Sequence, residues 1–266
     1  MCGFAGILSC NEWGESVLDA MGSAIIHRGP DDGGIWSDKK AGIGLAHRRL
    51  SILDLSPAGH QPMQSKSERF VIAFNGEIYN HLELRKQLVG VAWKGHSDTE
   101  TLLAGFEQWG IKRTLERAIG MFAFAVWDNH NQLLTLARDR AGEKPLYYGW
   151  QKNNGKSAFL FGSELKALKM NPVFQGDVNR GALSLLLRHN CIPAPYSIYD
   201  GIWKLNPGCI LKISLKNREP EILRYWSAAK IASRGVSNTL TGSPNDLISE
   251  FETILKDSIR QQMISD

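Results

Sequence analysis

The chain has 266 residues, of which 43% are hydrophobic and 22% are charged, as in a globular protein with one large domain or one domain and part of a second. Its net charge of +4 comes from scattered Lys and Arg residues, so we expect no nucleic-acid partner. No apolar run reaches the roughly 20 residues of a membrane span and the start does not resemble a signal peptide, which predicts a cytoplasmic protein with no membrane partner. The cysteines lie far apart without C-x-x-C spacing, which predicts free thiols and no zinc site: Cys2, Cys10, Cys191 and Cys209.

Eight short segments rich in β-branched and aromatic residues predict strands. In chain order they are CGFAGIL (2–8), GIGLAH (42–47), RFVIAF (69–74), MFAFAVWD (121–128), LLTLARD (133–139), PLYYGW (145–150), AFLFGSE (158–164) and CILKISL (209–215). Apolar residues at helical spacing predict helices near residues 17–25, 82–88 and 102–109.

The segment 121–128 has no polar face. Its alternating side chains form two apolar sets: Phe122, Phe124 and Val126 on one face, and Ala123, Ala125 and Trp127 on the other. A strand of this kind needs cover on both sides, and the short NHN link to the next strand indicates an antiparallel hairpin. With helices between the strands, this predicts an α+β fold, namely a four-layer αββα sandwich of antiparallel sheets.

The last part of the chain differs in character. Residues 216–244 are polar and contain Pro, Gly, Ser and Asn, which predicts a linker. Ser243 and Pro244 suit the N-cap and first turn of a helix whose apolar residues recur at helical spacing. We therefore expect a first domain over residues 1–215, the linker over 216–244, and the start of a truncated second domain over 245–266.

Cys2 follows the initiator methionine directly and precedes a glycine. Removal of Met1 would leave Cys2 with a thiol and a free α-amine, whose pKa of about 7.7 to 8.0 lets it accept the thiol proton near neutral pH. Cys2 would then carry both a nucleophile and its base. The alternative is a small buried residue at the start of a strand, and the position alone leaves both open.

Asn75 and Gly76 follow a predicted strand, where Asn-Gly usually forms a hairpin turn. Asn80 and Glu83 resemble a helix-capping pair, so we expect a helix next and predict that residues 75–77 form a loop. Such a loop can direct the Asn75 amide and the Gly76 N–H at one point, as in an oxyanion hole.

Asp98 and Arg49 each have an ordinary interpretation. Asp98 would lie in the first turn of a helix capped by Ser97 and Glu100, where a carboxylate is favourable, and Arg49 would simply end a strand. Either could instead bind a ligand, the carboxylate an ammonium and the guanidinium a carboxylate. The segment HRGPDD (27–32) is typical of a structural turn, and the histidine spacing predicts no metal site.

Together these segments resemble one family. The matching motifs are Cys2-Gly3, HRGPDD (27–32), LAHRRLSILD (45–54), FNGEIYNH (74–81), SDTE (97–100), GMFAFAVWD (120–128), ARDRAGEKPLYY (137–148) and GSELKAL (162–168). They resemble the glutaminase domain of class II glutamine amidotransferases, and most of all that of glutamine-hydrolysing asparagine synthetase. The resemblance spans about residues 2–215 and implies the N-terminal nucleophile hydrolase fold.

The resemblance implies a catalytic role for three residues. Cys2 would attack the side-chain amide of glutamine, with its own α-amine as base. Asn75 and Gly76 would hold the tetrahedral oxyanion. The products would be glutamate and ammonia, formed through a thioester with no metal or cofactor in this part of the protein.

The resemblance also implies how glutamine is bound. Arg49 would bind its α-carboxylate, while Glu77 and Asp98 would bind its α-ammonium. The backbone of a consecutive run would line the same pocket: Leu50, Ser51, Ile52 and Leu53. The HRGPDD segment would lie beside the site and shape it.

The partners follow from the same resemblance. Ammonia would pass to a synthetase domain that uses ATP and Mg²⁺ and is missing from this chain, and the tail LKDSIRQQMISD (255–266) resembles the segment leading into that domain. A homodimer is a further expectation. Two alternatives stay open: the glutaminase half of an enzyme that amidates another acceptor, such as a sugar phosphate, a phosphoribosyl group or a surface polysaccharide, and a non-catalytic domain for dimerisation or regulation.

Overall fold

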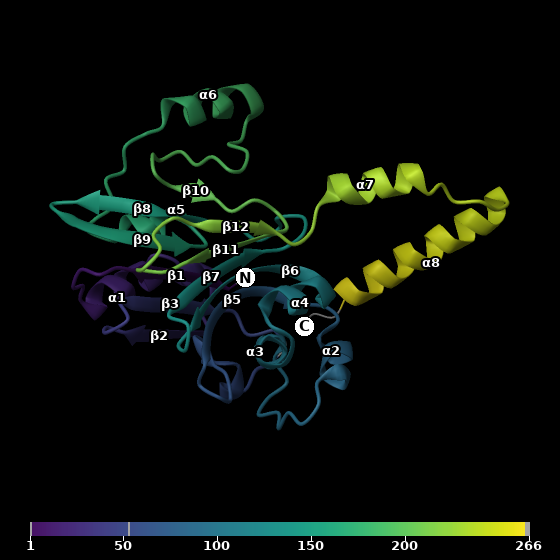
Figure 1. Ribbon diagram of the computed structural model, residues 1–266, viewed down its shortest axis with the longest axis horizontal. Helices are drawn as coiled ribbons and strands as arrows, with labels where there is room; N and C mark the ends of the chain where they lie inside the picture. Colours follow the sequence, from purple (N-terminus) through teal and green to yellow (C-terminus); the bar gives the residue numbers. More distant parts are fainter. Residues whose placement is uncertain (1, 53, 264–266) are drawn as a thin grey trace.

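The computed structural model describes residues 2–52 and 54–263, and two six-stranded antiparallel sheets form its centre (Figure 1). In spatial order, the first sheet contains β10 (Trp203–Lys204), β8 (Tyr147–Asn153), β9 (Lys156–Gly162), β1 (Gly3–Leu8), β3 (Ile43–Arg49) and β2 (Asp32–Asp38). The second contains β12 (Glu221–Arg224), β11 (Cys209–Ile213), β7 (Leu133–Arg138), β6 (Gly120–Asp128), β5 (Phe70–Ile78) and β4 (Met63–Gln64). All eight predicted strands are present.

Helices cover the outer faces of both sheets. The first sheet packs against α1 (Glu15–Ser23) and α5 (Leu165–Lys169), and the second against α2 (His81–Gln87), α3 (Asp98–Trp109) and α4 (Ile111–Arg117). The remaining helices are α6 (Arg180–His189), α7 (Ala228–Ser237) and α8 (Pro244–Gln262), with short 3₁₀ turns at Ile26–Arg28 and Pro57–Gly59. The predicted four-layer αββα sandwich is therefore confirmed.

β6 shows why the layers form. Its side chains Ala123, Ala125 and Trp127 are buried between the two sheets, whereas Phe122, Phe124 and Val126 pack against the helices that cover the second sheet. Burial of each large apolar side chain contributes about 1.5 to 3 kcal/mol. The absence of a polar face on this strand is thus matched by cover on both sides.

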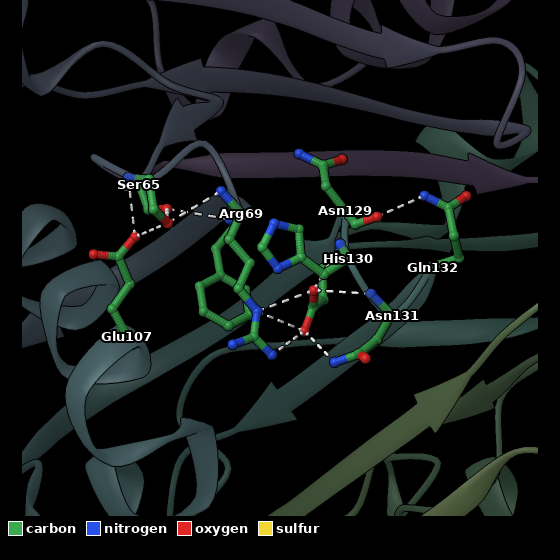
Figure 2. A network of polar contacts seen from close by, with 10 residues as sticks. Ser65, Arg69, Glu107, Asn129, His130, Asn131 and Gln132 are labelled. Atoms are coloured by element: carbon green, nitrogen blue, oxygen red, sulfur yellow. Dashed lines mark hydrogen bonds and ion pairs between the residues drawn. The ribbon is translucent and has the colours of Figure 1, made fainter.

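The turn between β6 and β7 is held by the carboxylate of Asp128. It accepts the backbone N–H groups of His130 and Asn131, and the guanidinium of Arg69 pairs with it at 2.8 Å (Figure 2). Arg69 directly precedes β5, so the ion pair ties the start of β5 to the end of β6. This fixes the register of the two strands, on which the geometry of the candidate site depends.

The end of the chain differs from the prediction of a linker over residues 216–244. β12 pairs with β11, and the hydroxyl of Tyr225 donates to the carbonyl of Arg138 at 2.9 Å, so the second sheet continues past the expected boundary at 215. α7 lies within the same stretch, and α8 begins as predicted, with the Ser243 side chain accepting the N–H of Asp246. Figure 1 shows α7 leading away from the sandwich and α8 running back towards it in this view. Within residues 2–52 and 54–263, no helix has the length and apolar character that a membrane crossing requires.

Candidate active site

One pocket brings most of the predicted site residues together. Eight of the ten line it: Cys2, Arg49, Leu50, Ile52, Asn75, Gly76, Glu77 and Asp98. Ser51 does not line it, and its backbone N–H instead donates to the Asp31 carboxylate of the HRGPDD segment at 2.8 Å. Leu53 lies outside the described residues. Segments far apart in the sequence therefore meet at the start of β1, the end of β3 and the end of β5.

The Cys2 thiol is held by backbone groups. Its Sγ lies 3.4 Å from both the carbonyl oxygen and the backbone nitrogen of Leu50, so it can donate to one and accept from the other. The guanidinium of Arg28 donates to the carbonyl of Cys2 at 2.8 Å, which fixes the backbone of Cys2. Burial raises the pKa of the thiol, although the Leu50 N–H opposes this. A thiol of this kind is protonated near neutral pH and needs a base; Met1, whose removal would free the α-amine, lies outside the described residues.

Asn75 and Gly76 belong to a strand, so the prediction of a loop at residues 75–77 is wrong. β5 runs through Ile78 and pairs with β6 along its whole length. A Cβ added at Gly76 would lie 2.6 Å from the Cα of Phe122 and closer still to the carbonyl oxygen of Met121. The glycine is therefore required by the close approach of β6 rather than by a turn.

The predicted capping pair after this strand is also absent. The Asn80 side chain does not cap α2; its amide donates to the carbonyl of Arg117 at 3.0 Å and its oxygen accepts the N–H of Ile119 at 2.8 Å. The Asn80 side chain thus connects the start of α2 to the end of α4 and the segment that follows it. The loop at residues 75–77 was expected because Asn80 was thought to cap a helix, and that reason no longer holds.

The N–H of Gly76 points away from β6. Residues opposite each other in an antiparallel pair direct their backbone groups either toward or away from one another. Phe122, opposite Gly76, uses its N–H and its carbonyl with Asp139, at 3.2 and 2.8 Å. The backbone groups of Gly76 therefore face the opposite edge of β5, on the side where Ile78 donates to Asp98 at 2.8 Å.

The Asn75 side chain is a buried amide without a partner. It is 1% exposed, and neither its nitrogen nor its oxygen has a hydrogen-bond partner within the described residues. A buried polar group left unpaired costs about 1 to 3 kcal/mol. Because Asn75 lines the pocket, its amide is placed to bond a group that enters from solvent.

Arg49 supplies a positive charge at the pocket. Its guanidinium donates to the carbonyl of Asp54 and, at 3.3 Å, to that of Ser56. A Cβ at Gly59 would collide with the guanidinium, so the glycine leaves room for it. The carboxylate of Asp54 in turn accepts the N–H groups of Ser56 and His96 at 2.9 and 2.8 Å, which holds the loop in place around the arginine.

Asp98 and Glu77 supply negative charge. Ser97 caps α3 by accepting the N–H of Glu100, as predicted, and this places Asp98 in the first turn with its carboxylate buried. The pKa of Asp98 is raised to about 7, mainly by burial and to a smaller extent by the charge of Glu77. Two adjacent carboxylates, one of them desolvated, favour a bound cation.

Lys144 lines the pocket but was not among the predicted site residues. Its loop is built by the Asp139 carboxylate, which accepts the N–H groups of Gly142, Glu143 and Lys144. Burial lowers the pKa of Lys144, while Glu77 opposes that shift. The ARDRAGEKPLYY motif could have indicated Lys144, because a lysine between a loop-forming Gly-Glu pair and a strand can point into a pocket. The spacing of the motif alone, however, assigned no role to this lysine.

The chemistry that this pocket can perform follows from its groups. It holds a thiol, a buried amide and a backbone N–H close to charges of both signs. An amino acid carries opposite charges at its α-carbon, so it complements such a pocket if its side chain reaches the thiol.

The comparisons with known proteins point the same way. A family model described as "Glutamine amidotransferase domain" matches residues 1–226. A putative glutamine-hydrolysing asparagine synthetase 2 of Methanocaldococcus jannaschii is 34% identical over 290 residues, covering 100% of this chain and 53% of the relative. Asparagine synthetase 3 of Bacillus subtilis is 33% identical and covers 100% of this chain and 42% of the relative. The chain thus spans about half or less of these relatives.

Solved structures share the fold. The glutamine phosphoribosylpyrophosphate amidotransferase of B. subtilis aligns with a TM-score of 0.60 at 18% identity, over 84% of this chain and 49% of that one. The allosteric regulatory enzyme of purine biosynthesis aligns with a TM-score of 0.61 at 20% identity, over 84% of this chain and 49% of that one. At this level of identity the likeness supports the N-terminal nucleophile hydrolase fold and nothing further.

Proposed function

Because this chain belongs to the glutamine amidotransferase domain family, we propose that it hydrolyses glutamine to glutamate and ammonia with Cys2 as the nucleophile. It is a class II member close to the asparagine synthetases. The observation that carries the proposal is the meeting of the Cys2 thiol and the unpartnered Asn75 amide in one pocket that has a cation and a carboxylate pair.

The reaction proceeds in two steps. The α-amine of Cys2, freed by loss of Met1, takes the thiol proton while Sγ attacks the amide carbon of glutamine. The oxyanion that forms accepts hydrogen bonds from the Asn75 amide and the Gly76 N–H. The C–N bond then breaks, ammonia leaves with the proton, and a thioester remains. Water attacks the thioester, the C–S bond breaks, and glutamate and the thiol are released.

Glutamine is oriented by its charged end. Arg49 binds the α-carboxylate, Glu77 and Asp98 bind the α-ammonium, and the backbone beginning at Leu50 lines the pocket. Asp98 is buried and lies near a second acidic side chain, Glu77, so this side of the pocket favours a positively charged group such as the α-ammonium. The hydrolysis is expected to need no metal or cofactor, and excess EDTA should leave it unchanged.

We extend the proposal to the whole protein. Ammonia would be passed to an ATP- and Mg²⁺-dependent domain that makes asparagine, in line with the names of the relatives, of which this chain covers only part. The alternative acceptors remain sugars and surface polysaccharides. A cytoplasmic location and a homodimer also stay proposals, because they rest on sequence alone.

The test uses the chain with Met1 removed, verified by intact mass. It is incubated with glutamine, aspartate and Mg-ATP, and glutamate, ammonia, AMP and asparagine are measured. We expect glutamate and ammonia in equal amounts, without AMP or asparagine, because residues 216–266 contain no G-x-x-x-x-G-K-[ST] phosphate loop. Absence of glutamate would favour the non-catalytic alternative, and AMP would reveal a nucleotide site in this chain.

A further inference from the structure

Beyond Ile72, the edge of β5 next to the pocket has no neighbouring strand among the described residues. The two-residue strand β4 pairs with β5 only at Val71 and Ile72, so it does not extend to residue 74. Backbone groups alternate along a strand, so those of residues 74, 76 and 78 face this edge together. The N–H of Gly76 therefore lies on this edge of β5.

Two buried side chains take the place of a neighbouring strand at Phe74. His47 Nε2 lies 2.9 Å from the Phe74 carbonyl oxygen, and the Phe74 N–H donates to Gln61 Oε1 at 2.7 Å. His47 is 1% exposed and Gln61 is 5% exposed. A carbonyl can only accept and an N–H can only donate, so Nε2 of His47 carries a proton and the oxygen of Gln61 faces the strand.

Both side chains are themselves fixed. Gln61 has its nitrogen 3.4 Å from the hydroxyl of Thr99, the residue after Asp98. His47 projects from β3 of the first sheet, two residues before Arg49, and spans the gap to the second sheet. Burial lowers the pKa of His47 to about 4, so the ring is neutral at working pH and serves as a donor rather than as a base.

We propose that His47 and Gln61 are positioning residues that hold the Phe74 peptide and thereby aim the Asn75 amide and the Gly76 N–H at the oxyanion. The inference rests on the proposed glutamine hydrolysis. Asp98 performs the matching task at Ile78, so the segment between them is clamped at both ends while Gly76 is left to face the pocket. Without the clamp at Phe74, this segment keeps its pairing with β6 but loses its support on the other edge.

The first test compares substitutions that remove the donor with those that keep it. His47→Leu should lower kcat about 10- to 100-fold with KM changed less than about threefold, the usual effect of a displacement near 1 Å at a reacting centre. His47→Gln, which can still place an N–H near Phe74, should recover most of the loss. Gln61→Met and Gln61→Glu form a second pair. Met removes the acceptor for the Phe74 N–H and should lower kcat, whereas Glu keeps the acceptor and should recover most of the loss. His81→Leu is the matched control, since His81 is a buried histidine on α2 and should leave kcat unchanged.

The second test separates positioning from a general loss of structure. If His47 acts through the oxyanion site, His47→Leu should lower kcat by a clearly smaller factor once Asn75 is already alanine, because only the Gly76 N–H is then left to be misplaced; kcat is measured with radiolabelled glutamine. Equal losses in both backgrounds would overturn the proposal, as would unchanged kcat in both His47→Leu and Gln61→Met. An unaltered chain without activity would refute the proposed function and this inference with it, whereas an active chain with unaffected variants would refute the inference alone.

Discussion

Asp98 gives a prediction in which stability and function oppose each other. Its pKa is raised from 3.8 to about 7, mainly by burial. A folded-state pKa above the unfolded value means that the protonated form favours folding, so this contribution is present at low pH and is lost as pH rises from about 4 to about 7. At about 1.4 kcal/mol for each tenfold change in proton affinity, the ionised carboxylate costs up to about 4 kcal/mol at pH 8.

Asp98→Asn should therefore stabilise the empty protein at high pH. The amide oxygen can still accept the N–H of Ile78, but no charge is buried. Urea unfolding without glutamine should show an increase in the free energy of unfolding of up to about 4 kcal/mol at pH 8 and little difference at pH 4. The KM for glutamine should meanwhile rise about 10- to 100-fold, because the ammonium loses a charged partner worth about 1.5 to 3 kcal/mol.

Asp128 provides a control, because its pKa is shifted in the opposite direction to that of Asp98. Burial alone would raise its pKa, but the hydrogen bonds and ion pair from Arg69 lower it. Asp128→Asn should therefore lose stability at pH 8, and this loss should shrink as pH falls below the unfolded value of the Asp128 pKa and on through the lowered pKa of the folded state. The reasoning would be refuted if Asp98→Asn were less stable than the unaltered chain at pH 8, or if its effect were the same at pH 4.

The other predictions concern the division of roles in the pocket. Arg49→Ala should weaken glutamine binding by about 1.5 to 3 kcal/mol and mainly raise KM, whereas Asn75→Ala should lower kcat about 10² to 10³ with KM little changed. The same kinetic pattern in both would contradict the separate roles. Gly76→Ala should cost about 1 to 3 kcal/mol of stability in thermal unfolding, because its Cβ would collide with the backbone at Met121. Gly235→Ala, where a Cβ would meet nothing within 4 Å, should cost nothing, and equal effects would refute the steric argument.

The layered fold was readable from the sequence because periodicity reports burial directly. β6 is apolar on both faces, and a strand with that pattern requires two covering layers. The strand β2 was missed because it contains Gly33 and Gly34, which read as turn residues. A Cβ at Gly34 would collide with the carbonyl of Gln61, so this glycine reflects close packing between distant segments, which local sequence does not reveal.

The sequence identified most residues that line the pocket, but it did not predict their geometry. Motif resemblance selected Asn75 and Gly76, yet local reasoning placed them in a loop, because the register against β6 and the diversion of Asn80 depend on tertiary contacts. Lys144 and Gln61 reach the pocket through loops whose course no short pattern specifies. Their side chains became candidates only once the strands were placed in space.

The most direct test of the account is the rate of glutamate release by Cys2→Ala, with Cys10→Ala as the matched control. Both are free thiols, but Cys2 lines the pocket and Cys10 is exposed outside it. Hydrolysis of glutamine by Cys2→Ala should fall to the background of the buffer while its thermal unfolding stays close to that of the unaltered chain, and Cys10→Ala should remain fully active. Glutamate release by Cys2→Ala at a rate comparable to the unaltered chain would contradict the proposal that Cys2 is the nucleophile.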